Sequence, residues 1–220
     1  MVSVEAATLG ETWLDVVAAI LGVGELATYD GEPVRELALL TLAVAEPDPA
    51  DRLIAELGDP AWSDWMHANF VEHGAVRELG DARSYADRLF DYGRRGHDQL
   101  AWVVERLRTD PASRSATITT FEPLEDESYI PCISMLDFWI PAGRLDLVVY
   151  AHSLDFGKKA NGNLVELAVL QRRVADELGQ PVGRLVVHAK SAHVYEPEWE
   201  AMAELTSGRV SAAGTRAAPH

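Results

Sequence analysis

Cys132 is the residue whose type most directly offers chemistry, because it is the only cysteine among the 220 residues of the sequence. It follows Pro131 and begins an apolar run, so its thiol stands at the start of a predicted strand. A thiol there can add to an electron-poor carbon as a nucleophile, or it can be buried as a small hydrophobic group. A lone cysteine forms no internal disulfide and no multi-cysteine zinc site, so we expect Cys132 to be reduced or catalytic.

Further polar side chains follow this thiol at spacings that suit a binding site. Asp155 and Asn163 precede a predicted helix, where each can serve a site or cap the helix. His193 and Tyr195 are two apart in a predicted strand, so they share one face, which fits a core pair as well as a ligand clamp. His188 and His193 are five apart and point to opposite faces, so we expect no metal site.

The elements that must position these groups are predicted by periodicity and by turn residues. Two apolar runs, residues 132–140 and 144–153, flank Pro141-Ala-Gly143 and indicate a β-hairpin. Asp98 is expected to cap a helix whose apolar stripe runs to Leu107. The other predicted helices cover residues 11–21, 51–57, 64–72, 82–92, 164–178 and 196–205, and the other strands cover residues 34–45, 116–121, 183–189 and 191–195.

Composition limits the classes of function. A formal net charge of −16 argues against a nucleic-acid surface, because binding a polyanion depends on Lys and Arg. With 48% hydrophobic residues, the chain can bury a full core, and we expect one domain over residues 1–206 and a flexible tail over 207–220. We find neither a leader pattern nor an apolar run of membrane-spanning length, and therefore expect a cytoplasmic protein.

The order of these motifs resembles the thymidylate synthase family, in its short, archaeal-like form. The resemblance rests on Pro131-Cys132, the hairpin that leads to Ser153-x-Asp155, the helix that opens near Asn163, and His193-x-Tyr195. A second matching stretch contains Asp98-Gln-Leu, a helix, and Asp110-Pro-Ala-Ser-Arg114. The resemblance implies an α/β single domain of the α+β type, with a mixed, largely antiparallel sheet backed by helices, and a homodimer.

The resemblance also implies a reaction and a set of roles. A one-carbon unit passes from 5,10-methylenetetrahydrofolate or a related reduced pterin to C5 of a pyrimidine nucleotide, and no metal takes part. In that reaction, Cys132 is the nucleophile at C6, and Glu36, in Arg35-Glu-Leu37, organises water for proton transfer. The remaining implied contacts are Asn163 and Asp155 on the base, His193 and Tyr195 on the sugar hydroxyl, and Ser153 and the partner subunit's Arg114 on the phosphate.

Three departures from the family pattern concern the phosphate. His152 stands in place of an arginine that touches both phosphate and sulfur, and Ser115 stands in place of a second arginine. We also find no glycine- and arginine-containing phosphate loop near the N-terminus. Histidine titrates near neutral pH and lacks the planar fork of arginine, so we interpret His152 as a weaker substrate-binding group. Two alternatives therefore stay open: a pyrimidine hydroxymethylase, and a nucleotide-binding relative without turnover.

Overall fold

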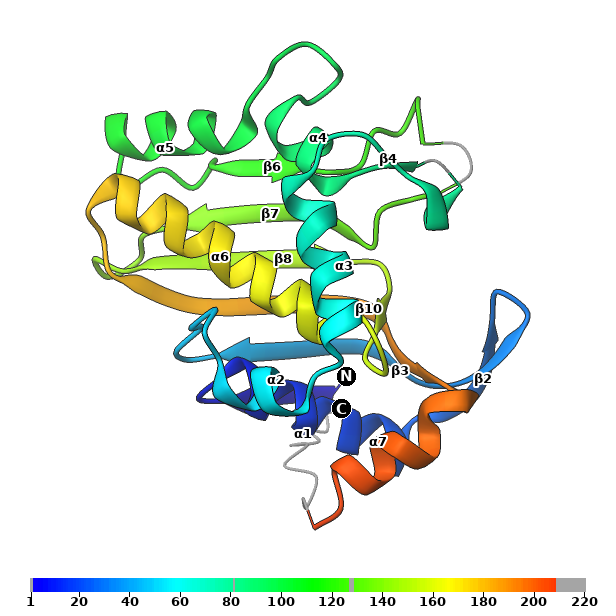
Figure 1. The fold of residues 1–220 in the computed structure, drawn as a ribbon. Coiled ribbons are helices and arrows are strands. Elements are labelled where there is room, and N and C mark those ends of the chain that lie inside the picture. The colour runs from blue at the N-terminus through cyan, green and yellow to red at the C-terminus, as the bar shows by residue number, and fades with distance from the viewer. Residues whose placement is uncertain (1, 81, 127–128, 209–220) are drawn as a thin grey trace, which may run out of the picture.

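An eight-stranded mixed sheet forms the centre of the computed structural model, which describes residues 2–80, 82–126 and 129–208 (Figure 1). The strand order is β1-β3-β10-β8-β7-β6, with β2 paired to β3 and β9 paired to β10. Antiparallel pairs join β2 to β3, β3 to β10, β8 to β7 and β7 to β6, whereas β1–β3, β8–β10 and β9–β10 are parallel. The strands are β1 (Val2–Ala6), β2 (Glu25–Tyr29), β3 (Glu32–Val44), β6 (Thr117–Thr119), β7 (Ile133–Trp139), β8 (Leu145–Ala151), β9 (Leu154–Asp155) and β10 (Val182–Tyr195). This arrangement confirms the predicted single α/β domain with a mixed sheet backed by helices.

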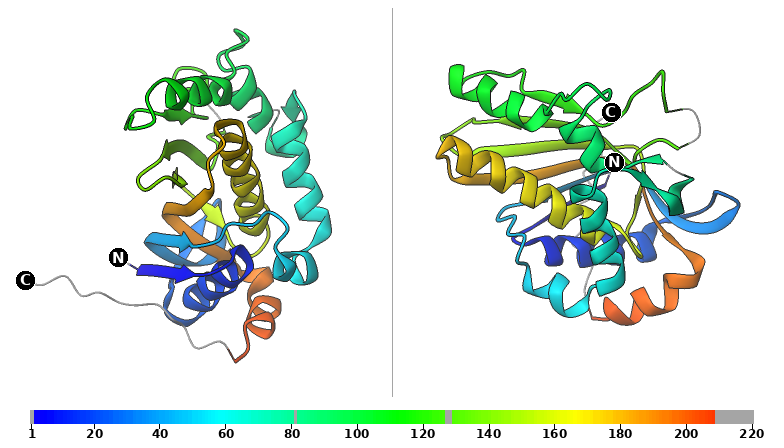
Figure 2. Two further views of the ribbon diagram at one scale, coloured as in Figure 1. Left: turned by 90° about the vertical axis from the view of Figure 1, so that its left-hand side faces the viewer. Right: turned by 45° about the horizontal axis from the view of Figure 1, so that its top comes forward.

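The helices gather on one face of the sheet, where α3 and α6 cross the strands (Figures 1 and 2). The long helix α6 buries Leu164, Leu167 and Val174 in the core, as its apolar spacing predicts. The helices are α1 (Leu9–Val23), α2 (Arg52–Leu57), α3 (Pro60–Val71), α4 (Tyr85–Phe90), α5 (Gln99–Thr109), α6 (Ala160–Leu178) and α7 (Trp199–Leu205). The side chains of these helices meet the sheet on one face only. The buried hydrophobic residues therefore form one core, between the helices and the sheet.

Two local predictions from the sequence are confirmed. The hairpin joins β7 to β8 in antiparallel register, with Leu136 opposite Val149 and a turn that contains Gly143 at a positive φ of 71°. Asp98 caps α5, since its side chain accepts a hydrogen bond of 2.9 Å from the amide of Ala101.

Helix α6 begins four residues earlier than predicted, at Ala160 rather than at residue 164. The stretch Asn161-Gly-Asn163 reads as a turn in the sequence, but the structure buries it in the first turn of the helix. Gly162 allows this close packing, because a Cβ there would lie 2.9 Å from the Cβ of Met66 on α3. Tertiary packing against α3 therefore overrides the local turn signal.

Other segments also differ from prediction. The expected helix over residues 82–92 is present but shorter, because α4 covers Tyr85–Phe90 with Ser84 as its N-cap. Before it, β5 (Ala82–Arg83) is a short strand paired with β4 (Ala75–Val76). Strands β1 and β2 were not predicted; β2 and β3 form a hairpin whose two-residue turn is Asp30-Gly31. The expected flexible tail falls largely on residues 209–220, outside the described residues.

The second face of the sheet carries no helix within the described part of the chain (Figure 2, left). Large apolar side chains are exposed on it, with Met135 and Trp139 on β7 each 39% exposed and Tyr150 on β8 40% exposed. No helix of the structure is both long and apolar enough to cross a membrane, among the residues it describes.

Candidate active site

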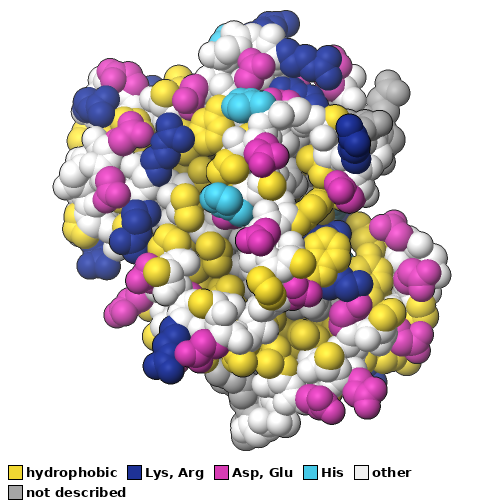
Figure 3. Space-filling view, viewed as in Figure 1, with side chains coloured by type: hydrophobic (Ala, Val, Ile, Leu, Met, Phe, Trp, Pro, Cys, Tyr) yellow, Lys and Arg dark blue, Asp and Glu magenta, His cyan; other side chains and the backbone are white. Residues whose placement is uncertain are grey.

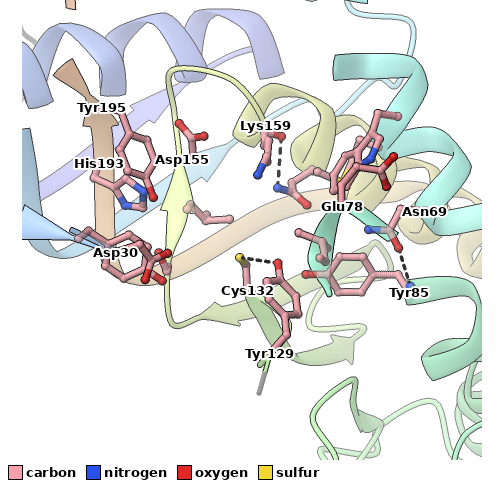
Figure 4. Close-up of a pocket in the computed structure, with 17 residues that line it drawn as sticks. Asp30, Asn69, Glu78, Tyr85, Tyr129, Cys132, Asp155, Lys159, His193 and Tyr195 are labelled. Carbon is pink, nitrogen blue, oxygen red and sulfur yellow. Dashed lines mark hydrogen bonds between the residues drawn. The ribbon is translucent and has the colours of Figure 1, made fainter. Parts of the chain in front are cut away.

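A cavity of about 340 Å³ opens at one end of the sheet and contains Cys132 (Figure 4). Six of the nine predicted site residues line it: Cys132, Ser153, Asp155, Asn163, His193 and Tyr195. They come from the loop before β7, the segment that follows β8, the first turn of α6 and the end of β10. Three predicted residues, Glu36, Arg114 and His152, are not part of the lining. The surface is hollowed between the part of the molecule that carries α3 and α4 and the part that carries α7 (Figure 3).

The backbone around Cys132 is fixed on both sides. The amide of His152 donates to the Cys132 carbonyl (2.9 Å), and the amide of Ile133 donates to the Tyr85 hydroxyl (3.0 Å). The Cys132 Sγ lies 3.8 Å from the Tyr129 hydroxyl. Burial raises the pKa of the Cys132 thiol, while the Tyr129 hydrogen bond and the charge of Lys159 act in the opposite direction. In this structure Cys132 is therefore a neutral thiol, and the Tyr129 hydroxyl and the Lys159 charge favour its ionisation.

Asn163 presents an unused acceptor to the cavity. Its Nδ2 donates to the Lys159 carbonyl at 3.2 Å, while its Oδ1 is buried and has no hydrogen-bond partner among the described residues. A buried carbonyl oxygen without a donor costs free energy, of the order of 1–3 kcal/mol. Because the side chain is 96% buried in a cavity wall, this oxygen is suited to accept a hydrogen bond from an N–H group of a ligand.

Asp155 organises the loop before α6. Its Oδ1 accepts hydrogen bonds from the amides of Gly157 (3.1 Å) and Lys158 (3.3 Å). Burial raises the pKa of Asp155 from 3.8 to about 6, although Lys159 and the Gly157 amide favour the carboxylate. A carboxyl group that titrates near neutral pH, on the wall of a cavity, can both donate and accept a proton.

We expect Asp155→Asn to stabilise the protein at pH 8 and not at pH 4. Because the pKa is higher in the folded state, the carboxylate costs folding free energy above pH 6, and this cost vanishes below about pH 4, where both states are protonated. A shift of this size corresponds to about 2 kcal/mol or more, and asparagine keeps an oxygen for the Gly157 amide. Urea unfolding of both proteins from pH 4 to 8 measures the difference, with the exposed Asp176→Asn on α6 as the control. A gain that does not depend on pH would contradict this explanation.

Aromatic side chains close the opposite end of the cavity. The ring of His193 lies 5.0 Å from that of Tyr29 and 5.1 Å from that of Tyr195, measured between centroids. Burial lowers the pKa of His193 to about 4, so its imidazole is neutral at neutral pH. Burial raises the pKa of Tyr29 and the neighbouring Ser153 side chain lowers it, while Asp30 lines the same end of the cavity (Figure 4).

The predicted residues outside the lining occupy three different places. Glu36 lies opposite His193 in the pairing of β3 with β10, and its negative charge opposes in part the lowering of the His193 pKa by burial. His152 lies in the bend between β8 and β9, next to Ser153 but outside the lining, and burial and the charge of Lys190 lower its pKa. Arg114 is exposed, and no hydrogen bond or ion pair is found for it within the described residues.

Several lining residues were not predicted as site residues. Lys159 is the only Lys or Arg of the lining, with its Nζ 5.3 Å from the ring centroid of Trp62 and 5.5 Å from that of Trp65. No local signal separates Lys159 from the adjacent Lys158, which pairs with Glu198 instead. Tyr29, by contrast, directly precedes the pair Asp30-Gly31, and an Asp-Gly pair is a strong hairpin signal in a sequence. The others missed were Trp65, Met66, Asn69, Glu78, Leu79, Tyr85, Tyr129 and Leu154.

Comparison with known proteins gives a consistent family match. Residues 45–214 match the family model described as thymidylate synthase. The protein named "Putative thymidylate synthase" from Methanosarcina barkeri is 28% identical, with 93% of this chain and 94% of the relative covered. Relatives of the same name from Methanothermobacter thermautotrophicus (28%; 92% and 97% covered) and Methanopyrus kandleri (30%; 89% and 93% covered) are also similar over nearly the whole chain. Among the described residues, no cluster of His, Cys, Asp or Glu is suited to hold a metal ion.

Proposed function

Because the chain belongs to the thymidylate synthase family, we propose that it transfers a one-carbon unit from a reduced folate to C5 of a pyrimidine through a covalent adduct of Cys132. The observation that carries the proposal is one cavity that holds the only thiol of the chain, the unpaired buried Oδ1 of Asn163, and the titratable carboxyl group of Asp155. The thiol can act as a nucleophile, the Asn163 oxygen can accept a hydrogen bond from the base, and the Asp155 carboxyl group can donate and accept a proton.

The chemistry assigned to Cys132 is addition of its sulfur to C6 of the ring. This addition moves negative charge onto O4 and makes C5 a nucleophile, which takes the carbon from the folate. Loss of the C5 proton breaks the bond between this carbon and the folate nitrogen. After hydride or water has added to the carbon, the C6–sulfur bond breaks and releases the Cys132 thiolate. Lys159 lines the same cavity and favours the thiolate through its charge, which opposes in part the rise in pKa that burial causes. Asn163 can accept from N3–H with Oδ1 and donate to O4 with the second hydrogen of Nδ2. Asp155 can exchange the protons that this sequence releases and consumes.

The folate supplies the carbon and, where a methyl group is formed, the hydride. The cavity offers a surface that fits a flat aromatic ring, because Trp65, Met66 and Leu79 line its wall on the side of α3. Trp62 supports Trp65 from behind in an edge-to-face contact with centroids 5.8 Å apart. These residues are the ones we assign to the folate.

We assign a homodimer interface to the open face of the sheet. Apolar side chains that are two-fifths exposed gather there, and such surfaces mark protein contacts. Arg114 lies before Thr117, which pairs with Asp137 on β7. Asp137 follows Cys132 by five positions, or about 16 Å along the strand, so Arg114 lies away from its own cavity. An exposed arginine in this place can serve the partner subunit's cavity.

Trp139→Glu is expected to convert the dimer into monomers. A two-fold interface places the same patch on both subunits, so the substitution sets like charges close together in an apolar contact. Trp102→Glu is the matched control, because Trp102 on α5 is 48% exposed but lies on the helical side of the sheet. Sedimentation velocity of the three proteins decides the matter, and a dimer that persists in Trp139→Glu would place the interface elsewhere.

The reaction itself is tested by product analysis. The protein is incubated with methylenetetrahydrofolate and with uridine, deoxyuridine, cytidine and deoxycytidine, each with and without a 5′-phosphate, and products are identified by mass spectrometry. A C5-methyl product supports methyl transfer, and a C5-hydroxymethyl product supports the hydroxymethylase alternative. Binding without any product would indicate a non-catalytic relative and refute the proposal.

A further inference from the structure

The sulfur of Cys132 has one hydrogen-bonding neighbour among the side chains that the structure describes. The hydroxyl of Tyr129 lies 3.8 Å from Sγ, within reach of a hydrogen bond to sulfur, and both side chains line the cavity (Figure 4). In the neutral pair either group can donate. A thiolate carries no hydrogen, however, so once Cys132 is ionised the O–H of Tyr129 is the donor. The contact is therefore suited to the reactive form of the sulfur.

The rest of the cavity gives a negatively charged sulfur little support. Three carboxyl groups line it, against the single ammonium group of Lys159. The charge of Lys159 favours ionisation of Cys132, and that of Asp155 opposes it. Lys159 places its Nζ over the tryptophan pair of α3, and no hydrogen bond from it to the sulfur is found within the described part of the chain. A donor in direct contact with the sulfur therefore matters more here than distant charge.

Two other groups beside Cys132 are engaged with the backbone. The Tyr85 hydroxyl accepts a hydrogen bond from the Ile133 amide at 3.0 Å, so it holds the chain after the nucleophile. His152 meets Cys132 through its own amide, which donates to the Cys132 carbonyl at 2.9 Å, and it lies outside the cavity lining. Neither side chain makes a hydrogen bond to the sulfur in the residues described. Tyr129 is the donor that remains.

Tyr129 keeps its own proton while it donates. Burial raises the pKa of Tyr129 above its usual value of 10.0, and a charged Cys132 raises it further. Burial also raises the pKa of the Cys132 thiol, but the hydrogen bond from Tyr129 lowers it. Because the hydrogen bond moves the two pKa values apart, the thiol ionises first. Tyr129 is thus a hydrogen-bond donor and not a source of protons.

We propose that Tyr129 is a catalytic residue whose hydroxyl donates a hydrogen bond to the Cys132 sulfur, before this sulfur adds to C6 of the pyrimidine and again when it leaves. In the addition, a lone pair of the thiolate forms the C6–sulfur bond. In the release, the pair of that bond returns to sulfur, and the negative charge reappears beside the Tyr129 O–H. A more stable thiolate is both more abundant at neutral pH and a better leaving group. The inference rests on the proposed function and adds a residue to it.

Tyr129→Phe removes the hydroxyl and keeps the ring. The chain is held on both sides of this position, at Asp126 and at the Cys132 carbonyl, and the substitution touches neither anchor. Tyr92→Phe is the matched control, because it removes the same atom from a tyrosine outside this cavity, whose hydroxyl donates to the Phe121 carbonyl at 3.3 Å. Tyr129→Met, which also lacks the hydroxyl, is the second variant if Tyr129→Phe does not fold.

The experiment measures the rate of alkylation of Cys132 by iodoacetamide from pH 6 to 10, and the only thiol of the chain reports alone. We expect Tyr129→Phe to move the pH profile upward by about one unit, because the thiolate loses a charge-assisted hydrogen bond. The thiolate fraction at pH 7 then falls about tenfold, while the less acidic thiol becomes about threefold more nucleophilic. The rate at pH 7 should therefore fall about threefold, and Tyr92→Phe should keep the wild-type profile.

Three results would overturn the inference. The first is a profile that loss of the Tyr129 hydroxyl leaves unchanged, and the second is an equal shift in Tyr92→Phe. The third is a rate that falls by the same factor at every pH, because a purely structural role of Tyr129 would slow the reaction without moving the pKa of Cys132.

Turnover separates this inference from the proposed function, since alkylation needs neither a pyrimidine nor a folate. With the substrate that product analysis identifies, Tyr129→Phe should lower kcat about tenfold and leave KM for the pyrimidine within about twofold, because the hydroxyl contacts the sulfur. Wild-type kcat in Tyr129→Phe would overturn the inference and leave the function standing. A shifted alkylation profile, with no product from any pyrimidine, would refute the proposed function and support the hydrogen bond from Tyr129 to the sulfur.

Discussion

Cys132→Ser is expected to abolish the covalent adduct and to lower turnover by about 10⁴-fold or more, which is the scale of losing a catalytic nucleophile. Serine is close to cysteine in size, but its hydroxyl is a far weaker nucleophile at neutral pH. The side chain is half-buried and its sulfur lies 3.8 Å from the Tyr129 hydroxyl, so the free energy of unfolding should change by no more than about 1 kcal/mol.

The measurement combines product formation, adduct mass and urea unfolding. Cys132 is the only thiol in the chain, so alkylation by iodoacetamide reports on this residue alone, and a bound pyrimidine should slow it. If Cys132 were instead a packing residue, the serine variant would lose stability and keep its turnover. That result would remove the covalent mechanism.

Arg88→Met is expected to cost about 3–5 kcal/mol of folding free energy, which is the usual cost of removing one partner of a buried ion pair. Arg88 is only 2% exposed and holds the Asp126 carboxylate with two hydrogen bonds, of 2.8 and 2.7 Å. It also donates to the Thr120 carbonyl at 2.8 Å. Methionine fills a similar volume but leaves Asp126 buried without its cation.

This network also bears on the active site, because it holds the chain just before Cys132. The Thr120 hydroxyl donates to the carbonyl of Ile133, which adjoins the nucleophile. Arg88→Met should therefore lower adduct formation as well as stability. Arg52→Met is the control, since Arg52 pairs with Glu56 at 2.6 Å on the exposed surface of α2, and such pairs contribute about 0–1 kcal/mol.

The double variant Arg88→Met/Asp126→Leu completes this test. Removing both charges should recover part of the stability lost in Arg88→Met, because an uncompensated buried carboxylate causes much of the loss. Urea unfolding of the wild type, Arg88→Met, Asp126→Leu and the double variant measures the coupling. If the double variant is no more stable than Arg88→Met, the loss of stability comes from lost packing and not from the unpaired Asp126 carboxylate.

Local patterns in the sequence account for the parts of the site that lie on one element. The β7–β8 hairpin follows from two apolar runs around Pro141-Ala-Gly143, and the shared face of His193 and Tyr195 follows from the two-residue period of a strand. His152 and Ser153 lie in the irregular segment between β8 and β9, and only Ser153 lines the cavity. The strand period does not apply in this segment, so the sequence did not determine which of the two side chains faces the cavity.

The tertiary structure alone decided which distant residues share the cavity. The pairing of β3 with β10 places Glu36 opposite His193, and the β2–β3 turn carries Asp30 to the same end, although both residues precede His193 by more than 150 positions. Packing of α6 on α3 through Gly162 turned an apparent Asn-Gly loop into a helix and set Lys159 over the tryptophans. Periodicity predicts which way a side chain points from its own element, whereas strand order and helix packing determine which side chains meet, because those depend on contacts between residues far apart in the chain.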